Sequence, residues 1–450
     1  MLYVLIAYGA AFGLPVLTYL LAGSWWPASL TVVHFTVATA YLVTAVMMLF
    51  ETAVALPRRK AALSHEDVLP RVPLVTVIVS AYLPNERDLI AETILHLSTG
   101  LRVPSHRLQI ILAYNTPEDL PVERELESFA GLSVSFTALR VAGSRSKAEN
   151  VNAALALAEG EMTVLLDADH LPEPDAIESA YRWLLQGYDV VQGRCVVRNQ
   201  RETLFTRYLA IEFEHMYNVA HTGRSQAFDT AIFGGTNGYW RTSVLKRIGM
   251  DAHMLTEDID SSIRAMLGGY RLVHDRSIIS SELATPRLRP WWNQRLRWAQ
   301  GWLQVTLRHQ SAIWRSPTLS VPTKLYWTYL LSWREIFPFL SLQVFSLLVA
   351  SSLLGRSIDW LGHPYLIATA GLTLLAGPAA SYATYRAALW RTKEALRGWF
   401  VIFAITTLPY VMLKNTVAMV AMMRELLGER TWRVTTRWQP VRDPTSRHSA

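Results

Sequence analysis

Long apolar runs stand near both ends of this chain, and a more polar region separates them. Two of them, 2–22 and 28–50, lie near the N-terminus, and three more, 336–354, 364–385 and 398–422, lie in the last third. A helix needs about 20 apolar residues to cross the hydrocarbon core of a bilayer. The pattern therefore predicts membrane-spanning helices on both sides of a central domain.

The number of spans stays open at this point. Residues 322–335, which end at Arg334 and Glu335, are a candidate for a further span, and one of the five runs can instead be interfacial. The basic residues of 57–60 follow the second run, and the positive-inside rule then places the central domain in the cytoplasm. Five spans would leave the basic tail, 424–450, on the outside, against the same rule.

The central region alternates apolar strands with helices. The runs 74–82, 108–114, 162–166 and 189–197 are short and rich in β-branched residues, which is typical of buried strands. Helical spacing fits 86–98, and Ser146 with Glu149 forms a capping-box pattern that opens a helix running to Gly160. This alternation predicts an α/β domain with a mainly parallel, Rossmann-like sheet covered by helices. Ligands of such sheets bind at the carboxyl ends of the strands, where Tyr82, Asn115 and Asp167 stand.

The net charge of +7 would favour binding to nucleic acid. Much of this charge lies beside the apolar runs, however, where anionic lipid headgroups attract Lys and Arg. The chain has no zinc-finger spacing and no aromatic RNA-binding signature, so we expect a lipid bilayer and no nucleic acid as a partner. Cys195 is the one cysteine, which excludes an intrachain disulfide and a cysteine-rich metal site.

Three motifs follow one another in the polar region and its border. They are Asp167-Ala168-Asp169, Thr256-Glu257-Asp258 and Gln294-Arg295-Leu296-Arg297-Trp298. Each alone has an ordinary explanation: an Asp pair can cap the next helix, an Asp in a first helical turn complements the helix dipole, and tryptophans anchor an interfacial helix. Divalent cations such as Mg²⁺ and Mn²⁺ take carboxylates together with substrate phosphates, so the acidic motifs also suit a diphosphate substrate.

The ordered trio resembles the nucleotide-sugar-dependent glycosyltransferases of family 2, and among them the membrane-embedded processive polysaccharide synthases. Asp167-Ala168-Asp169-His170-Leu171-Pro172 resembles the Asp-Ala-Asp-His-Val-Pro of bacterial cellulose synthases, and Lys147-Ala148-Glu149-Asn150-Val151-Asn152 resembles their Lys-Ala-Gly-Asn-Leu-Asn. The resemblance covers about residues 74–303. It implies a glycosyltransferase-A domain inserted between transmembrane helices.

The resemblance also implies roles for individual residues. Asp258 is expected to be the general base of an inverting transfer, and Asp169 the ligand of Mg²⁺ or Mn²⁺. Contacts with the acceptor are expected from the segment after Gly234 and from the motifs at 256–258 and 294–298. The residues expected at the nucleotide sugar are Tyr82, Glu86, Asn115, Lys147, Asp167, Gln294 and Arg297, and those at the acceptor are Gly235, Thr236, Asn237, Glu257 and Trp298.

Two motifs depart from the family. The usual acidic pair after the second strand is replaced by Ala113-Tyr114-Asn115, and the first-strand motif reads Ala81-Tyr82-Leu83-Pro84-Asn85-Glu86 in place of Pro-x-Tyr-Asn-Glu. Uridine recognition at Asn115 is therefore an open point. UDP-glucose is the favoured donor, because the segments at 147–152 and 167–172 read like those of cellulose synthases.

These expectations divide the chain into five parts: transmembrane helices (1–56), a cytoplasmic glycosyltransferase domain (57–287), interfacial amphipathic helices (288–325), transmembrane helices (326–423) and a basic tail (424–450). The expected enzyme lies in the cell's inner membrane and extends a polysaccharide. The alternative acceptor is a lipid that receives a single sugar, and a transporter with a degenerate domain is a third reading. The sugar, the linkage, an accessory export subunit and a homo-oligomer all remain open.

Overall fold

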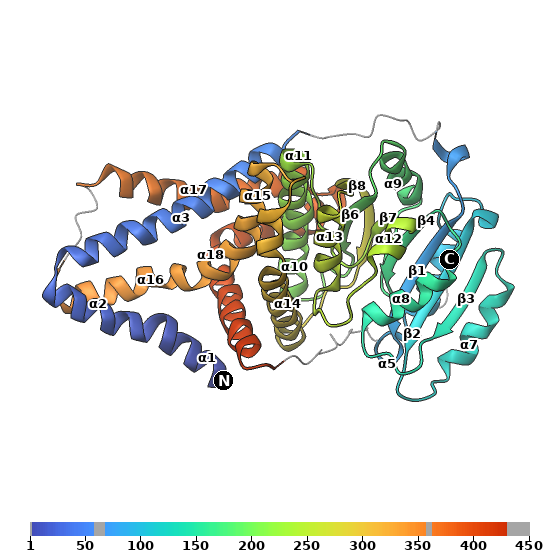
Figure 1. Ribbon diagram of the computed structural model, residues 1–450, viewed down its shortest axis with the longest axis horizontal. Coiled ribbons are helices and arrows are strands. Elements are labelled where there is room, and N and C mark those ends of the chain that lie inside the picture. The colour runs from blue at the N-terminus through green and yellow to red at the C-terminus, as the bar shows by residue number, and fades with distance from the viewer. Residues whose placement is uncertain (1, 58–67, 357–361, 430–450) are drawn as a thin grey trace.

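The computed structural model describes residues 2–57, 68–356 and 362–429. Long helices occupy one end of the molecule and an α/β domain the other, and the two parts meet along the long axis (Figure 1). The basic residues Arg58, Arg59 and Lys60 lie outside the described residues, and so do 430–450 of the predicted tail.

Five helical segments among the described residues are long and apolar enough to cross a membrane. The first, Leu2–Trp25, joins α1 (Leu2–Tyr8), a π-helical turn (Gly9–Gly13) and α2 (Leu14–Trp25). The others are α3 (Ala28–Ala55), Val321–Leu353, α17 (Pro364–Ala387) and α18 (Trp390–Leu426). These helices cover every run that the apolar pattern picked out.

Residues 322–335 do not form a span of their own. They belong to the third helical segment, which joins α15 (Val321–Thr328), a π-helical turn (Tyr329–Trp333) and α16 (Arg334–Leu353). Pro322 lies in the first turn of the segment, where a proline fits because that turn needs no intrahelical donor. Arg334 and Glu335 therefore lie inside the segment and not at its end.

One eight-stranded sheet forms the centre of the α/β domain, in the order β3-β2-β1-β4-β7-β6-β8-β5. Four strands, β1, β2, β4 and β6, match the predicted runs to within one residue, whereas the other four were not predicted. The strands are β1 (Val75–Tyr82), β2 (Leu108–Asn115), β3 (Ser135–Arg140), β4 (Met162–Asp167), β5 (Leu171–Pro172), β6 (Val190–Val197), β7 (Gly238–Arg241) and β8 (Leu272–Glu282).

The prediction of a mainly parallel sheet holds. The strands β3, β2, β1 and β4 form a parallel half, β6 and β8 run in the same direction, and β7 and β5 are antiparallel to their neighbours. In the register of the parallel half, Ser80 pairs with Asp167 and Tyr82 with Asn115. The carboxyl ends of three neighbouring strands therefore meet at one edge.

Helices cover both faces of this sheet (Figure 1). Buried side chains such as Ile90, Ile94 and Trp183 fill one face, and others such as Val151, Ile263 and Trp240 fill the opposite face. The helices are α5 (Leu83–Glu86), α6 (Ile90–Thr99), α7 (Val122–Ser128), α8 (Lys147–Leu157), α9 (Ala176–Leu185), α10 (Leu204–His215), α11 (Thr222–Phe228), α12 (Thr242–Ile248) and α13 (Glu257–Leu267). The sheet and its helices confirm the expected α/β class.

The helix α14 (Leu288–Arg315) joins the α/β domain to the apolar helices. On one side His309 Nε2 lies 2.7 Å from Oδ1 of Asp260 on α13. On the other side the amides of Gln300 and Gln304 donate to Glu425 of α18 at 2.9 and 3.0 Å. Because α14 is held from both sides, its side chains are placed firmly against the domain.

Candidate active site

A lysine and an aspartate meet at the carboxyl edge of the sheet. Asp167 ends β4, and Lys147 begins α8, where Ser146 caps the helix by accepting the N–H of Glu149 at 3.2 Å. The Nζ of Lys147 donates to Asp167 and, at 2.6 Å, to the carbonyl oxygen of Gly235. The capping box is half formed, because Glu149 accepts the N–H of Arg145 instead of that of Ser146.

The Lys147 ammonium is surrounded by carboxylates. Burial alone would lower its pKa, but the negative charges of Asp167, Glu257 and Asp258 raise the pKa above its ordinary value. The side chain therefore stays charged at neutral pH. A fixed cation beside strand ends is suited to bind an anionic ligand such as a diphosphate.

The loop at Gly235 brings Asp258 to the same place. Gly235 has a φ of +88°, and a Cβ added to it would lie 2.7 Å from Oδ2 of Asp258. Any other residue would be strained in this conformation and would push the carboxylate away. The next residue, Thr236, accepts the N–H of Asp167 through its hydroxyl at 3.1 Å, which fixes the loop against β4.

Asp258 lies in the first turn of α13, where it accepts the N–H of Ile259 at 2.8 Å. Burial and the charge of the neighbouring Glu257 raise the pKa of Asp258 to about 7, and Lys147 and Arg297 act in the opposite direction. A carboxylate whose pKa lies near the working pH is well matched to accept a proton and release it again. The arrangement therefore suits general base chemistry.

Arg297 is the member of the α14 motif that faces this cluster. Its Nη1 donates to the carbonyl oxygen of Leu255 at 3.2 Å, and its charge acts on Asp258. Trp298, on the next position of α14, lies against Arg295, whose guanidinium carbon is 4.5 Å from the indole centroid. Gln294 is partly exposed one turn before Trp298. In this motif, Arg297 therefore lies toward the carboxyl edge of the sheet, and Trp298 lies toward the apolar helices.

Asp169 and His170 complete a set of oxygen and nitrogen donors beside Asp167. Each of the three offers a ligand atom within 4.8 Å of the other two. The Oδ2 of Asp169 accepts the N–H of Leu283 at 3.0 Å, which holds the buried carboxylate near the end of β8. The two carboxylates fit Mg²⁺ or Mn²⁺, which prefer hard oxygen ligands. His170 was not predicted as a site residue, although it directly follows the acidic pair.

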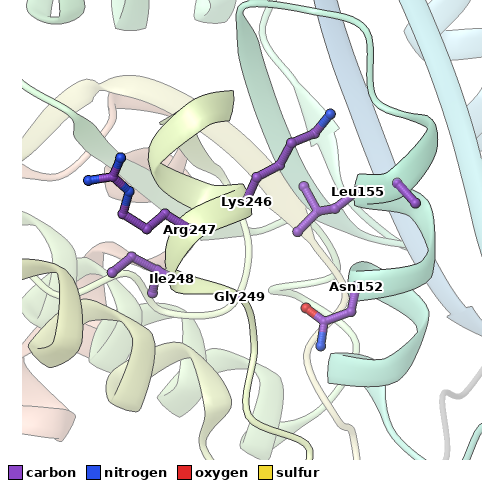
Figure 2. Close-up of a pocket in the computed structure, with 7 residues that line it drawn as sticks. Asn152, Leu155, Lys246, Arg247, Ile248 and Gly249 are labelled. Atoms are coloured by element: carbon purple, nitrogen blue, oxygen red, sulfur yellow. The ribbon is translucent and has the colours of Figure 1, made fainter.

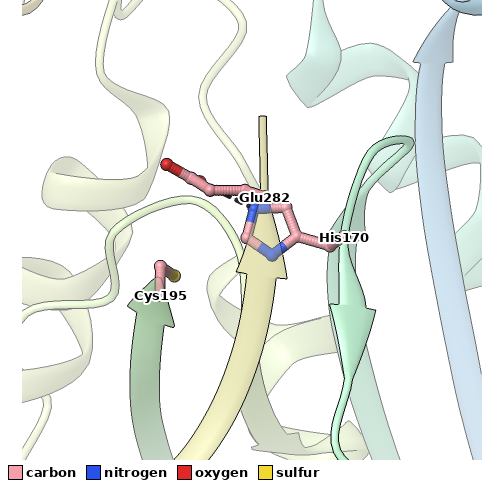
Figure 3. Close-up of side chains that lie close together, drawn as sticks. All are labelled: His170, Cys195 and Glu282. Carbon is pink, nitrogen blue, oxygen red and sulfur yellow. Dashed lines mark hydrogen bonds and ion pairs between the residues drawn. The ribbon is translucent and has the colours of Figure 1, made fainter. Parts of the chain in front are cut away.

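His170 is positioned by β8 (Figure 3). Its Nδ1 lies 3.0 Å from the hydroxyl of Ser280, and its Nε2 lies 2.9 Å from Glu282. The thiol of Cys195 on β6 faces the same point, so that His170, Cys195 and Glu282 form a second close donor group. Burial raises the pKa of this thiol well above its usual value, which keeps it protonated and unreactive.

Four predicted residues lie apart from the Lys147–Asp258 cluster. Tyr82 and Asn115 stand at the ends of β1 and β2, and Glu86 accepts the backbone N–H of Tyr82 at 2.9 Å. The amide of Asn115 donates to Ser144 and accepts from Asn150. Asn237 is fully buried, and its amide donates to the carbonyl oxygens of Arg194 and Ile278 at 3.0 and 3.2 Å. Asn237 thus ties the loop to the sheet.

A buried ion cluster joins the domain to α14 and α18, and the sequence motifs did not point to it. Glu212 of α10 binds Arg295 at 2.6 Å, the hydroxyl of Tyr410 at 2.8 Å and Lys414 at 2.7 Å. Burial alone would raise the pKa of Glu212, but the charges of Arg295 and Lys414 lower it to about 2. This carboxylate therefore stays ionised and holds α14 in place.

A cavity of about 470 Å³ lies away from the predicted site, between α8 and α12 (Figure 2). Asn152 and Leu155 line it from α8, and Lys246 and Ile248 from α12. The Nζ of Lys246 donates to the carbonyl oxygen of Ala158 at 2.8 Å. None of the residues that the motifs single out as site residues lines this cavity.

Residues 162–413 match the family model described as Glycosyl transferase family group 2, which is more than half of the 450 residues. The matched segment contains β4 with its acidic pair, the loop at Gly235, α13 and α14. The matched segment therefore includes Asp167, Gly235, Asp258 and Arg297, whereas Lys147 lies before it.

Curated relatives carry glycosyltransferase names. The chain is 30% identical over 246 residues to the probable glycosyltransferase YdaM of Bacillus subtilis (strain 168), which covers 53% of this chain and 58% of that protein. It is 25% identical over 258 residues to a cellulose synthase catalytic subunit [UDP-forming] of Komagataeibacter sucrofermentans, covering 55% and 33%. It is 27% identical over 248 residues to the probable glucomannan 4-beta-mannosyltransferase 7 of Oryza sativa subsp. japonica, covering 52% and 41%. The chain thus spans less than two thirds of each of these relatives.

Among solved structures, the fold is similar to that of the mannosyltransferase PcManGT from Pyrobaculum calidifontis in complex with GDP-Man and Mn²⁺. The TM-score is 0.53 at 21% identity, over 89% of this chain and 98% of that one. The likeness confirms the expected fold, an α/β glycosyltransferase domain combined with long apolar helices.

Proposed function

Because the chain belongs to glycosyl transferase family group 2, we propose that it is an inverting glycosyltransferase that takes its sugar from a UDP-sugar. The observation that carries this proposal is the meeting of Lys147, Asp167 and Asp258 around the loop at Gly235. It joins an anion-binding cation to a carboxylate whose pKa is about 7. These are the two groups that sugar transfer from a diphosphate requires.

In the proposed reaction, an acceptor hydroxyl oxygen attacks the anomeric carbon as the bond from that carbon to the diphosphate oxygen breaks. Asp258 accepts the hydroxyl proton, so a neutral acceptor gains a glycosidic bond and UDP leaves with the bonding electrons. Lys147 and Arg297 face the region where the negative charge of UDP grows. Fixed cations that act on developing charge lower the barrier to bond breaking.

We propose that Asp169, together with Asp167, holds Mg²⁺ or Mn²⁺. When bound, the cation would neutralise part of the charge of the diphosphate. The contribution of the chain itself is a preformed carboxylate, because the N–H of Leu283 holds Asp169 in place before any ligand arrives.

The nucleoside is proposed to lie at the ends of β1 and β2. Tyr82 stands there with a partly exposed ring, and Glu86 fixes the backbone that carries it. The Asn115 carbonyl oxygen accepts one hydrogen bond from Asn150 and retains a second lone pair for a base N–H. UDP-glucose is the proposed donor, because residues 147–152 and 167–172 resemble the corresponding motifs of cellulose synthases.

We propose a polysaccharide as the acceptor. Gly235, Thr236 and Glu257 lie around Asp258, where the acceptor hydroxyl must stand, and Trp298 on α14 offers an indole face to a sugar ring. For Asn237 we propose a positioning role, since its side chain is buried in the sheet. Gln294 is proposed to assist Arg297 at the diphosphate from one turn away.

The five apolar helices suit an integral protein of the inner membrane. We propose that its catalytic domain faces the cytoplasm, because nucleotide sugars are made in the cytoplasm. In this arrangement a secreted polymer would leave through the helical part. A lipid acceptor that receives one sugar is the alternative, because the same helices would hold it at the membrane.

The test is to incubate the purified chain in detergent with Mn²⁺ and labelled UDP-glucose, UDP-N-acetylglucosamine or GDP-mannose, and to size the product. We expect a product of many sugar units from UDP-glucose, with Trp298→Ala giving a shorter one at unchanged UDP affinity. A product that carries a single sugar on a lipid would show that the acceptor is a lipid and not a polysaccharide. No transfer from any of these donors would contradict the proposed activity itself.

A further inference from the structure

A second cavity, of about 270 Å³, lies beside the apolar helices, and none of the residues of the Lys147–Asp258 cluster lines it. Side chains from α3, α11, the third span and α18 line it. Its polar lining is Thr44, Glu51, Arg224, Arg334 and Asn415, and its apolar lining is Tyr329, Leu330, Trp333, Phe337 and Pro338.

The cavity lies where the spanning helices meet the α/β domain. Thr44, Arg334 and Asn415 belong to three of the candidate spans, whereas Arg224 belongs to α11. Lys414, the residue before Asn415, binds Glu212 of α10 at 2.7 Å, which holds this part of α18 against the domain. Arg334 lies inside the third span, and charged groups in membrane spans are costly and are kept for a function.

Two guanidinium groups face this cavity. Arg224 is 94% buried, and its Nε donates to the hydroxyl of Tyr326 at 3.1 Å, whereas its Nη1 has no hydrogen-bond partner among the described residues. Arg334 exposes its side chain, and its guanidinium carbon lies 4.3 Å from the ring of Trp302 on α14. Within the described part of the chain, no carboxylate forms an ion pair with either of them.

The lining also contains a carboxylate, but that carboxylate is engaged. Glu51 accepts the hydroxyl of Tyr326, which holds it against α15. The lining residues then carry two positive charges and one negative charge, so the cavity favours an anion. An arginine binds phosphate through a planar fork of donors, and an unpartnered buried donor is costly unless a ligand or water meets it.

From these contacts we infer that the cavity binds the phosphate headgroup of an anionic lipid, with Arg224 and Arg334 as its ligands. The position against the spanning helices and the aromatic lining point to a lipid as the source of the phosphate. The volume lies just below the range of about 300–1,000 Å³ that is usual for whole small-molecule ligands, so it suits a headgroup.

The site adjoins the active-site helix. Trp302, on which Arg334 lies, follows Gly301, and a Cβ on Gly301 would meet the side chain of Thr256 at 2.5 Å. Thr256 directly precedes α13, the helix that carries Asp258. A bound headgroup would therefore steady α14 from the membrane side. The inference does not depend on the donor or acceptor proposed above.

The experiment measures lipid binding to the purified full-length chain in a neutral maltoside detergent by native mass spectrometry. Phosphatidic acid is compared with diacylglycerol, which has the same acyl chains without the phosphate, and with inorganic phosphate. We expect one saturable phosphatidic acid per chain, and no retained diacylglycerol. Arg334→Gln and Arg224→Gln should each weaken the binding at least about tenfold, as expected for loss of a charged hydrogen bond.

Arg397→Gln is the matched control, because Arg397 is an exposed arginine of α18 that does not line the cavity. It should bind phosphatidic acid as the unchanged chain does. If Arg224→Gln unfolds, as its thermal midpoint would reveal, Arg334→Gln alone decides, since the Arg334 side chain is exposed.

Three outcomes would overturn the inference. Equal binding of phosphatidic acid to Arg334→Gln and to the unchanged chain would mean that water fills the cavity, as polar cavities commonly do. Retention of diacylglycerol as strong as that of phosphatidic acid would show that the phosphate is not what the cavity binds. Displacement of phosphatidic acid by inorganic phosphate at equal concentration would make the ligand a soluble anion.

Discussion

Asp258 and Glu212 are two enclosed carboxylates whose surroundings act in opposite ways. Burial and the adjacent Glu257 raise the pKa of Asp258 to about 7. Burial alone would raise that of Glu212 as well, but Arg295 and Lys414 lower it to about 2. The same chemical group is therefore ready to take a proton at one place and is permanently charged at the other.

The difference lies in the donors that each carboxylate meets. Glu212 accepts from a guanidinium, an ammonium and a phenol, which come from two helices of different parts of the molecule. In the described residues, the side chain of Asp258 accepts one hydrogen bond, from the N–H of Ile259. A fully paired charge stabilises a structure, whereas an incompletely paired one stays available for chemistry. We therefore propose that Glu212 stabilises the contact of α10 with α14 and α18, and that Asp258 accepts the proton in the reaction.

The largest effect should follow Asp258→Asn. An amide cannot accept the acceptor proton, so we expect the transfer rate to fall by about 10²–10⁴-fold, the usual contribution of a general base. UDP affinity and the thermal midpoint should stay near those of the unchanged chain, because the amide retains the shape of the side chain. Glu127→Gln, the same change at an exposed position of α7, is the control. Transfer within tenfold of the unchanged chain would exclude Asp258 as the base.

Glu212→Ala should produce the complementary result, a loss of stability. It leaves Arg295 and Lys414 without their carboxylate, and breaking a buried ion pair costs about 3–5 kcal/mol. We expect the thermal midpoint in detergent to fall by roughly 5–10 °C. Glu394→Ala on α18 is the control, since Glu394 is exposed. An unchanged midpoint would show that the cluster does not hold α14 to the domain.

Asp169→Ala tests the metal ligand with a smaller expected effect. A cation that loses one protein carboxylate bridges the diphosphate less well, so UDP affinity in Mn²⁺ should fall about tenfold or more. UDP affinity in the presence of a chelator should be the same for both proteins. Calorimetric titration of UDP measures both conditions, and equal affinity in Mn²⁺ would contradict the assignment of Asp169.

Local sequence patterns predicted four strands that are buried along most of their length. β1 and β4 are continuous apolar runs, whereas β3 is half exposed at the edge of the sheet and has no apolar run. The meeting of Lys147, Asp167 and Asp258 was predicted from the resemblance to a family, because spacing alone leaves an ordinary explanation for each. The Glu212 cluster could not be predicted, since Arg295 and Lys414 lie 83 and 202 residues further along the chain.

The pH dependence separates the two carboxylates without any mutation. Asp258 must be ionised to act as a base, so transfer should rise with pH up to about 7 and fall about tenfold for each pH unit below it. The folded-state pKa of Glu212 is depressed, so the stability that it contributes is present above its ordinary value near 4.5 and is lost only as the pH falls toward 2.

Between pH 5 and pH 7 we therefore expect a steep change in transfer rate and no loss of the Glu212 contribution to the thermal midpoint. The measurement follows the initial rate at saturating UDP-sugar and Mn²⁺, with the thermal midpoint recorded in the same buffers. The difference in midpoint between the unchanged chain and Glu212→Ala should stay constant over this range, because the carboxylate remains ionised throughout. A rate that does not change with pH while the chain stays folded would mean that Asp258 is ionised well below pH 7. A midpoint difference that shrinks toward pH 5 would instead place the titration of Glu212 close to that of an ordinary carboxylate, and the contrast between the two sites would disappear.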